Sequence, residues 1–119
     1  MRDFRKLQVW EKAHRLTLLI YEATMDFPAD ERFGLTGQLR RAAASIPINT
    51  AEGCGREGVR ELARFLSIAA GSASEVEYQL LLARDLNYIQ NETYEELDQL
   101  VNEVKMMLNS FLQKLNAKC

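Results

Sequence analysis

The sequence predicts an all-α protein, folded as an antiparallel up-down-up-down four-helix bundle. Apolar residues recur every three or four positions in four segments, no segment alternates with period two over a strand's length, and short turns separate the segments. The 119 residues are 47% hydrophobic and 27% charged, the composition of an ordinary globular protein. We therefore expect one domain, a single bundle over residues 1–119.

The first helix is expected from about residue 7 and must end before Phe27-Pro28, because a residue before proline avoids the α conformation. The second follows the turn at residues 27–34 and contains Pro47, which removes a backbone donor and predicts a kink near Ser45 or Ile46. Their apolar stripes are Leu7, Trp10, Ala13, Thr17, Ile20 and Thr24, then Leu35, Leu39, Ala42, Ile46, Thr50 and Gly53.

The third helix is expected from about Val59 to Leu86, and a turn at residues 87–91 follows it. Thr93 and Glu96 have the spacing of a capping box, which predicts that the fourth helix starts there. The two stripes are Leu62, Phe65, Leu66, Ala69, Ala73, Val76, Leu80 and Ala83, then Leu97, Leu100, Val101, Val104, Leu108, Phe111, Leu112 and Leu115.

Three glycines in the stretch AEGCGREG have the spacing G-x-G-x-x-G: Gly53, Gly55 and Gly58. A dinucleotide site needs a strand before this motif, and the G-x-x-G loop of nucleic-acid-binding domains needs a sheet around it. Here a helix precedes the glycines. We expect them to end the second helix, to turn into the third and to bind no nucleotide.

A polar stripe accompanies the apolar one on the second helix: Gln38, Arg41, Ser45, Asn49, Glu52 and Arg56. It is either a solvated face with ion pairs or a partly buried hydrogen-bond network, and both interpretations stay open at this point. Small residues around Gly71 predict close approach of another helix, and Glu75 after them is expected to be partly buried and paired with Arg41, Arg40 or Asn49. The predicted network is Arg41, Ser45, Asn49, Glu52, Ser72 and Glu75.

Catalytic chemistry is poorly supported, and we expect no enzyme, no metal and no cofactor. His14, the single histidine, has no local signature that would pair it with Cys54 or Ser45 as a nucleophile, although spacing alone does not exclude either pair. A carboxylate-bridged metal centre would need Glu-x-x-His, which is missing from the sequence. Cys54 and Cys119 are expected to be free thiols.

The charge balance argues against an obvious nucleic-acid binder, since the net charge is -2 and the pI is about 5.5. The average hides an asymmetry: residues 1–60 carry ten Lys or Arg against eight Asp or Glu, and residues 61–119 carry five against nine. One surface can therefore still be basic. The amino end has neither a signal peptide nor a membrane span, so we expect a cytoplasmic protein without membrane contact.

Several motifs together resemble a known family. Phe4 with VWEKA, then FGLTGQLRRAAASIPINTAEGCGR from Phe33 to Arg56, then FLSIAAGSASEVEYQL from Phe65 to Leu80 are similar to the bacterial four-helix bundle proteins encoded in intervening sequences of 23S rRNA genes. Asn49-Thr50-Ala51 stands where the family usually has Asn-Ile-Ala. The resemblance implies a left-handed bundle, a homopentamer and no known catalytic activity. The family is similar in turn to the accessory protein of diversity-generating retroelements, a pentameric barrel that binds nucleic acid and a reverse transcriptase.

Two function classes follow. In one, an oligomer binds RNA electrostatically through a basic surface of Arg2, Arg5, Lys6, Lys12, Arg40, Arg41, Arg56 and Arg60. In the other, the protein is an assembly or protein-interaction module, and these residues are ion-pair partners. Apolar residues off the stripes predict a subunit interface formed by Phe4, Tyr21, Tyr78, Leu81, Leu82 and Tyr88.

Overall fold

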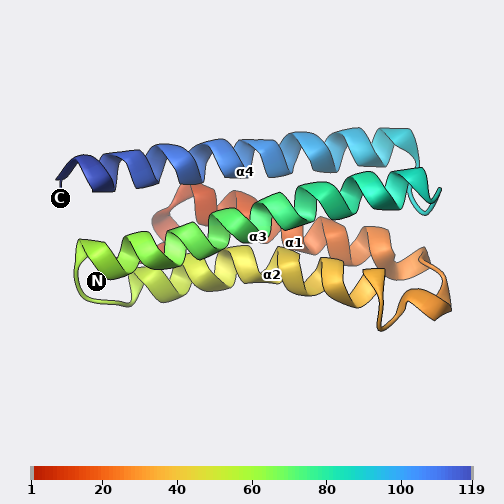
Figure 1. Ribbon diagram of the computed structural model, residues 1–119, viewed down its shortest axis with the longest axis horizontal. Coiled ribbons are helices and arrows are strands. Elements are labelled where there is room, and N and C mark those ends of the chain that lie inside the picture. Colours follow the sequence, from red (N-terminus) through yellow and green to blue (C-terminus); the bar gives the residue numbers. More distant parts are fainter. Residues whose placement is uncertain (1, 119) are drawn as a thin grey trace.

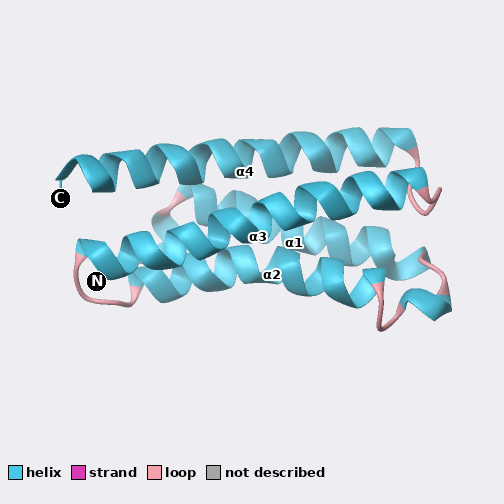
Figure 2. Ribbon diagram, in the orientation of Figure 1, coloured by secondary structure: helices cyan, strands magenta, loops and turns pink. Residues whose placement is uncertain are grey.

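The computed structural model describes residues 2–118, with the side chains of residues 2–117, as a four-helix bundle measuring 45 × 23 × 20 Å. Its long helices are α1 (Gln8–Ala23), α2 (Leu35–Cys54), α3 (Val59–Asp85) and α4 (Asn91–Lys118). Short 3-10 helices cover Phe4–Lys6, Thr24–Asp26 and Ala29–Glu31. Residues 2–118 contain no strand (Figure 2).

Consecutive helices run in opposite directions, which confirms the up-down-up-down prediction (Figure 1). α1 and α3 each pack against both α2 and α4, so the four helices enclose one core. The start of α1, the end of α2, the start of α3 and the end of α4 therefore lie at the same end of the bundle. The left-handed sense that the resemblance implies stays a prediction.

The predicted helix bounds are confirmed within a residue or two, but the capping box at Thr93 is wrong. Helix α4 already begins at Asn91, and the Tyr94 N–H donates to the Gln90 carbonyl at 2.9 Å. The preceding turn is short because Asn87 takes a left-handed conformation with φ 63°. There the Tyr88 N–H donates to the Ala83 carbonyl at 2.9 Å, which closes α3 in the Schellman pattern.

The core consists mainly of aliphatic side chains from all four helices, most of them in the predicted stripes. On α1 the buried Val9 and Leu16 lie outside the predicted stripe, whereas its Leu7 and Trp10 are only half-buried. Leu16, Ile46, Leu66 and Leu108 are among the side chains with no exposed surface. Pro47 is also buried, and α2 remains helical on both sides of it. The predicted kink stays a prediction, but the helix accommodates its proline without interruption.

Candidate nucleic-acid interface

A small polar cluster joins α2 to α3 in the middle of the bundle. The Ser45 Oγ lies 2.8 Å from the Ser72 Oγ, and the Asn49 Nδ2 donates to the Ser45 carbonyl at 2.8 Å and to its Oγ at 2.9 Å. All three residues are half-buried. Both interpretations of the polar stripe are therefore right in part: its middle forms a network across two helices, and its ends are exposed.

The other three residues of the predicted network lie outside it. Arg41 is exposed, and Glu52 pairs with Arg56 at 3.4 Å on the surface. Glu75 is also exposed and accepts a hydrogen bond from the Gln79 Nε2 at 3.2 Å, so its predicted burial is wrong. The cause is the helical phase, because Glu75 follows buried Ala73 by two positions and points away from the core.

Two of the glycines inside the helices, Gly53 of α2 and Gly71 of α3, differ in what surrounds them. A Cβ on Gly53 would meet the Phe65 Cβ at 3.0 Å and the Leu62 Cδ1 at 3.1 Å, so Gly53 permits the close approach of α2 and α3. A Cβ on Gly71 would meet nothing within 4 Å. Gly71 itself therefore faces outward, whereas the predicted close approach is made by its small neighbours: Ala69 and Ala73 are fully buried, and Ser72 contacts Ser45 of α2.

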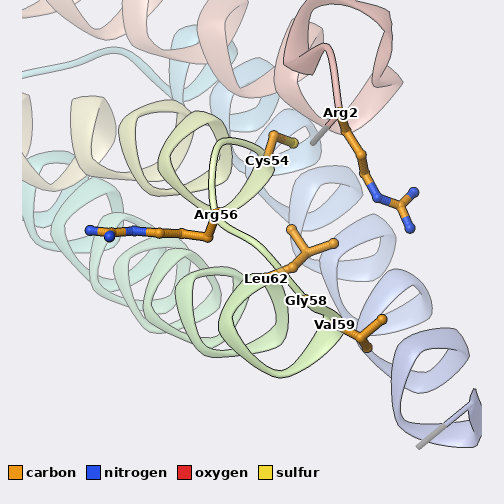
Figure 3. A pocket seen from close by; sticks show the side chains of 7 residues that line it. Arg2, Cys54, Arg56, Gly58, Val59 and Leu62 are labelled. Carbon is orange, nitrogen blue, oxygen red and sulfur yellow. The ribbon is translucent and has the colours of Figure 1, made fainter.

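The glycine turn between α2 and α3 adopts the predicted role. Gly55 caps α2, and Gly58, with φ 86°, precedes α3. Beside the turn is a hollow of about 190 Å³ lined by Cys54, Leu62 and Val59, from which the side chains of Arg2 and Arg56 extend in different directions (Figure 3). The turn itself is a connection at one end of the bundle, and the Arg2 N–H fixes the chain start to it by donating to the Cys54 carbonyl at 2.9 Å.

The candidate nucleophiles are not arranged around the histidine. Among the described residues neither Cys54 nor Ser45 forms a hydrogen bond with His14, which is exposed and stacks on Trp10 with ring centroids 5.0 Å apart. Burial raises the pKa of the Cys54 thiol, an effect that the nearby Arg2 opposes. A buried, protonated thiol is a poor nucleophile. Cys119 lies outside the described residues.

Charge is strongly segregated along the bundle. We define the basic end as residues 2–11, 51–64 and 108–117, and the acidic end as residues 20–38 and 82–98. The basic end carries seven Lys or Arg and five Asp or Glu, whereas the acidic end carries two and nine. The two ends therefore differ in sign, at +2 and -7, and the remaining residues contribute +3 to the net charge of -2.

Five of the eight predicted cations gather at the basic end: Arg2, Arg5, Lys6, Arg56 and Arg60. Arg5 pairs with Asp3 at 3.5 Å, a solvent-exposed contact that leaves most of the guanidinium accessible. Arg2, Lys6 and Arg60 have no carboxylate within 4.0 Å among residues 2–117. These three side chains are therefore available to pair with an anionic ligand.

The other three predicted cations lie elsewhere, and two of them have structural contacts. Lys12 pairs with Glu103 of α4 at 3.0 Å, and this hydrogen bond lowers the pKa of Glu103. Arg40 donates to the Thr24 Oγ1 at 2.7 Å and lies over the Tyr21 ring. Arg41 is exposed on α2. The predicted basic surface is therefore not one surface, and its coherent part is the end of the bundle.

Comparison with known proteins identifies a family that this chain matches. Residues 5–110 match the model of the 23S rRNA-intervening sequence protein family. The chain belongs to this family. A solved structure of a protein with unknown function from Bacteroides thetaiotaomicron VPI-5482, of the S23 ribosomal protein family, is similar with a TM-score of 0.79 and 26% identity. The match covers 87% of this chain and 97% of that one, and no curated protein matches the chain.

Two cations of this 23S rRNA-intervening sequence protein were missed by the sequence argument. Arg64 lies one turn after Arg60 on α3, and Lys114 lies near the end of α4. Arg64 pairs with Glu61 at 2.9 Å, and its hydrogen bond lowers the pKa of Glu61. Up-down-up-down topology alone places both residues at the end of the bundle where the chain starts. The predicted topology could therefore have identified them, although no sequence motif does.

The predicted interface residues also divide into two groups. Phe4, Leu82 and Tyr88 pack against the core, so they do not belong to a free apolar face. Tyr21 and Tyr78 are exposed, and Leu81 is half-buried. Exposed apolar side chains that the sequence argument missed include Leu18, Met25, Phe33 and Ile48.

Within residues 2–118, no helix is long and apolar enough to span a membrane. In the same part of the chain, no three His, Cys, Asp or Glu side chains come close enough together to hold a metal ion.

Proposed function

We propose that this protein is a cytoplasmic, non-enzymatic RNA-binding protein and that RNA contacts the basic end. The observation that carries the proposal is the segregation of charge, which leaves Arg2, Lys6, Arg60 and Lys114 without carboxylate partners in the described chain. A polyanion is attracted to such an end and repelled by the other. The family's description, which refers to 23S rRNA, supports RNA as the polyanion.

Salt-dependent binding to a structured RNA tests the proposal. Affinity should fall steeply with salt, because each phosphate that a cation neutralises releases counterions. Replacing Arg2, Arg5 and Lys6 with Glu should abolish binding. The matched control replaces Arg15, Arg32 and Arg41 with Glu, which changes the net charge equally but lies outside the basic end. Equal loss in both variants would mean that net charge, and not the basic end, governs binding.

We further propose that the protein forms a homo-oligomer, for which the resemblance suggests five copies. Leu18 and Tyr21 of α1 and Met25 of the following 3-10 helix are exposed at spacings of three and four residues, and Phe33 beyond them is 87% exposed. A patch of this kind is typical of an interaction surface. Multi-angle light scattering measures the mass directly, and a monomer would contradict the proposal.

The same apolar patch supports the alternative function, a protein-interaction or assembly module that binds no nucleic acid. In that case the protein is still an oligomer but does not bind RNA even at low salt. Replacing Leu18 and Met25 with Gln should then disperse the oligomer. Filter binding at low salt with wild-type protein separates the two functions.

A further inference from the structure

The strongest unassigned feature is a hollow between the start of α1 and the last turns of α4. Its volume is about 440 Å³. Its lining combines apolar side chains that are buried or half-buried with two exposed cations: Leu7, Val9, Met107, Phe111, Arg2 and Lys114. Gln8 and Ser110 also line it, and no acidic residue does.

The two cations are available to a ligand. The Arg2 guanidinium carbon lies 5.5 Å from the centre of the Phe111 ring, and the main chain of Arg2 is held by its hydrogen bond to Cys54. Within residues 2–117, neither Arg2 nor Lys114 has a carboxylate within 4.0 Å. The Phe111 ring therefore lies beneath the Arg2 guanidinium, in a hollow that a second cation without a carboxylate partner also lines.

We infer that this hollow receives one unstacked nucleotide of a single-stranded RNA segment, an inference that rests on the proposed function. The base takes the place of the Arg2 guanidinium over the Phe111 ring and packs on the apolar lining. The displaced Arg2 side chain and Lys114 contact the adjoining phosphates. Gln8 and Ser110 provide an amide and a hydroxyl for the base edge or the ribose. A base within a duplex is stacked on both faces and does not enter, so the hollow selects single-stranded RNA.

The surroundings of the hollow favour a strand over a free nucleotide. Arg2 also lines two neighbouring hollows, one with Arg56 and one with Arg5. A strand that places one nucleotide at Phe111 can therefore continue past further cations. A free nucleotide gains only the contacts at Arg2 and Lys114.

The test compares a short dye-labelled single-stranded RNA with the same RNA annealed to its complement, by fluorescence anisotropy over a salt series. Phe111→Leu keeps an apolar side chain but removes the ring, and should weaken single-strand binding about 5- to 150-fold, since stacking on one ring is worth about 1–3 kcal/mol. It should leave the duplex affinity and the salt slope unchanged. Lys114→Gln should reduce the salt slope by about 0.7 for the single strand. Tyr94→Leu is the control, because it removes a ring beneath Arg84 at the acidic end, and it should change neither the single-strand affinity nor the salt slope.

The outcomes separate this inference from the proposed function. If Phe111→Leu binds the single strand as tightly as the wild type does, the nucleotide site is wrong. The proposal that RNA contacts the basic end still holds in that case if binding is salt-sensitive and is lost in the Arg2, Arg5 and Lys6 triple variant. If the wild-type protein binds no RNA at low salt, both fail. A changed mass of Phe111→Leu in light scattering would assign the hollow to contact between copies and overturn the nucleotide site. Circular dichroism melts confirm that each variant is folded.

Discussion

The Thr17 hydroxyl on α1 reaches the Ala43 carbonyl oxygen on α2, at an Oγ1 to O distance of 3.1 Å. In an uninterrupted α-helix this carbonyl would accept from the N–H of residue 47, but Pro47 has none. The hydroxyl also lies 2.8 Å from the Ala13 carbonyl in its own helix. Thr17 therefore shares its single hydroxyl proton between a carbonyl of its own helix and the α2 carbonyl that Pro47 deprives of its usual donor.

Thr17→Val should destabilise the protein by about 1–3 kcal/mol, because the buried Ala43 carbonyl loses its donor while the side-chain shape is kept. Urea unfolding followed by circular dichroism measures this. Introducing Pro47→Ala together with Thr17→Val should reduce the loss, since residue 47 then supplies an N–H. Independent, additive effects of the two substitutions would show that Thr17 and Pro47 are not coupled.

Gly53 and Gly71 should respond to alanine in opposite directions. Gly53→Ala places a methyl group against Phe65 and Leu62 and should destabilise by about 1–3 kcal/mol. Gly71→Ala meets open space and should stabilise by about 0.5–1 kcal/mol through the better helix propensity of alanine. Thermal unfolding of both variants checks the pair, and a destabilised Gly71→Ala would indicate that another copy of the chain covers this face.

Stability should fall in acid through Glu31. Its carboxylate accepts from the Leu35 N–H at 3.0 Å and from the Tyr88 hydroxyl at 2.8 Å, and these bonds lower the pKa of Glu31 from its ordinary 4.5. A lowered folded-state pKa contributes stability that is present above pH 4.5 and is lost as the pH falls through the folded-state value. The urea midpoint should decrease as the pH is lowered below 4.5, and it should decrease less steeply in Glu31→Gln.

Stability at alkaline pH should depend on Tyr88, which donates the hydrogen bond to Glu31. Hydrogen bonding to Glu31 raises the pKa of Tyr88 above its ordinary 10.0, so its contribution is complete below pH 10.0 and is lost as the pH rises through the folded-state pKa. Tyr88→Phe should remove this alkaline loss in urea unfolding. An alkaline loss as steep in Tyr88→Phe as in the wild type would assign it to other groups.

Helical periodicity was enough to predict four helices, their order and most of the core, because each stripe here is long and uninterrupted. Local signals near helix ends were less reliable: the spacing of Thr93 and Glu96 suits a cap, but the left-handed Asn87 shortens the turn and starts α4 earlier. Glu75 and Gly71 were misplaced because their small neighbours were given more weight than helical phase, although the predicted stripe through Ala69, Ala73 and Val76 already placed both residues on the outer face of α3.

The candidate interface was only partly predictable for a related reason. Charge counted along the chain shows two halves, whereas the fold brings residues 2–11, 51–64 and 108–117 together from three parts of the sequence. Arg64 and Lys114 could have been included by applying the predicted topology to every cation. The contacts of Lys12 with Glu103 of α4 and of Arg40 with Tyr21 of α1 depend on side-chain geometry and needed the structure.

The separation of the two ends also gives each molecule a large electric dipole moment along its 45 Å axis. Near a polyanion such a molecule experiences a torque, so it rotates before contact and arrives with residues 2–11 foremost. Orientation then becomes part of the association rate, and added salt should slow the encounter as well as weaken the final complex. In a ring of parallel copies the individual dipoles add, and the whole assembly would have one face that attracts RNA and one that repels it.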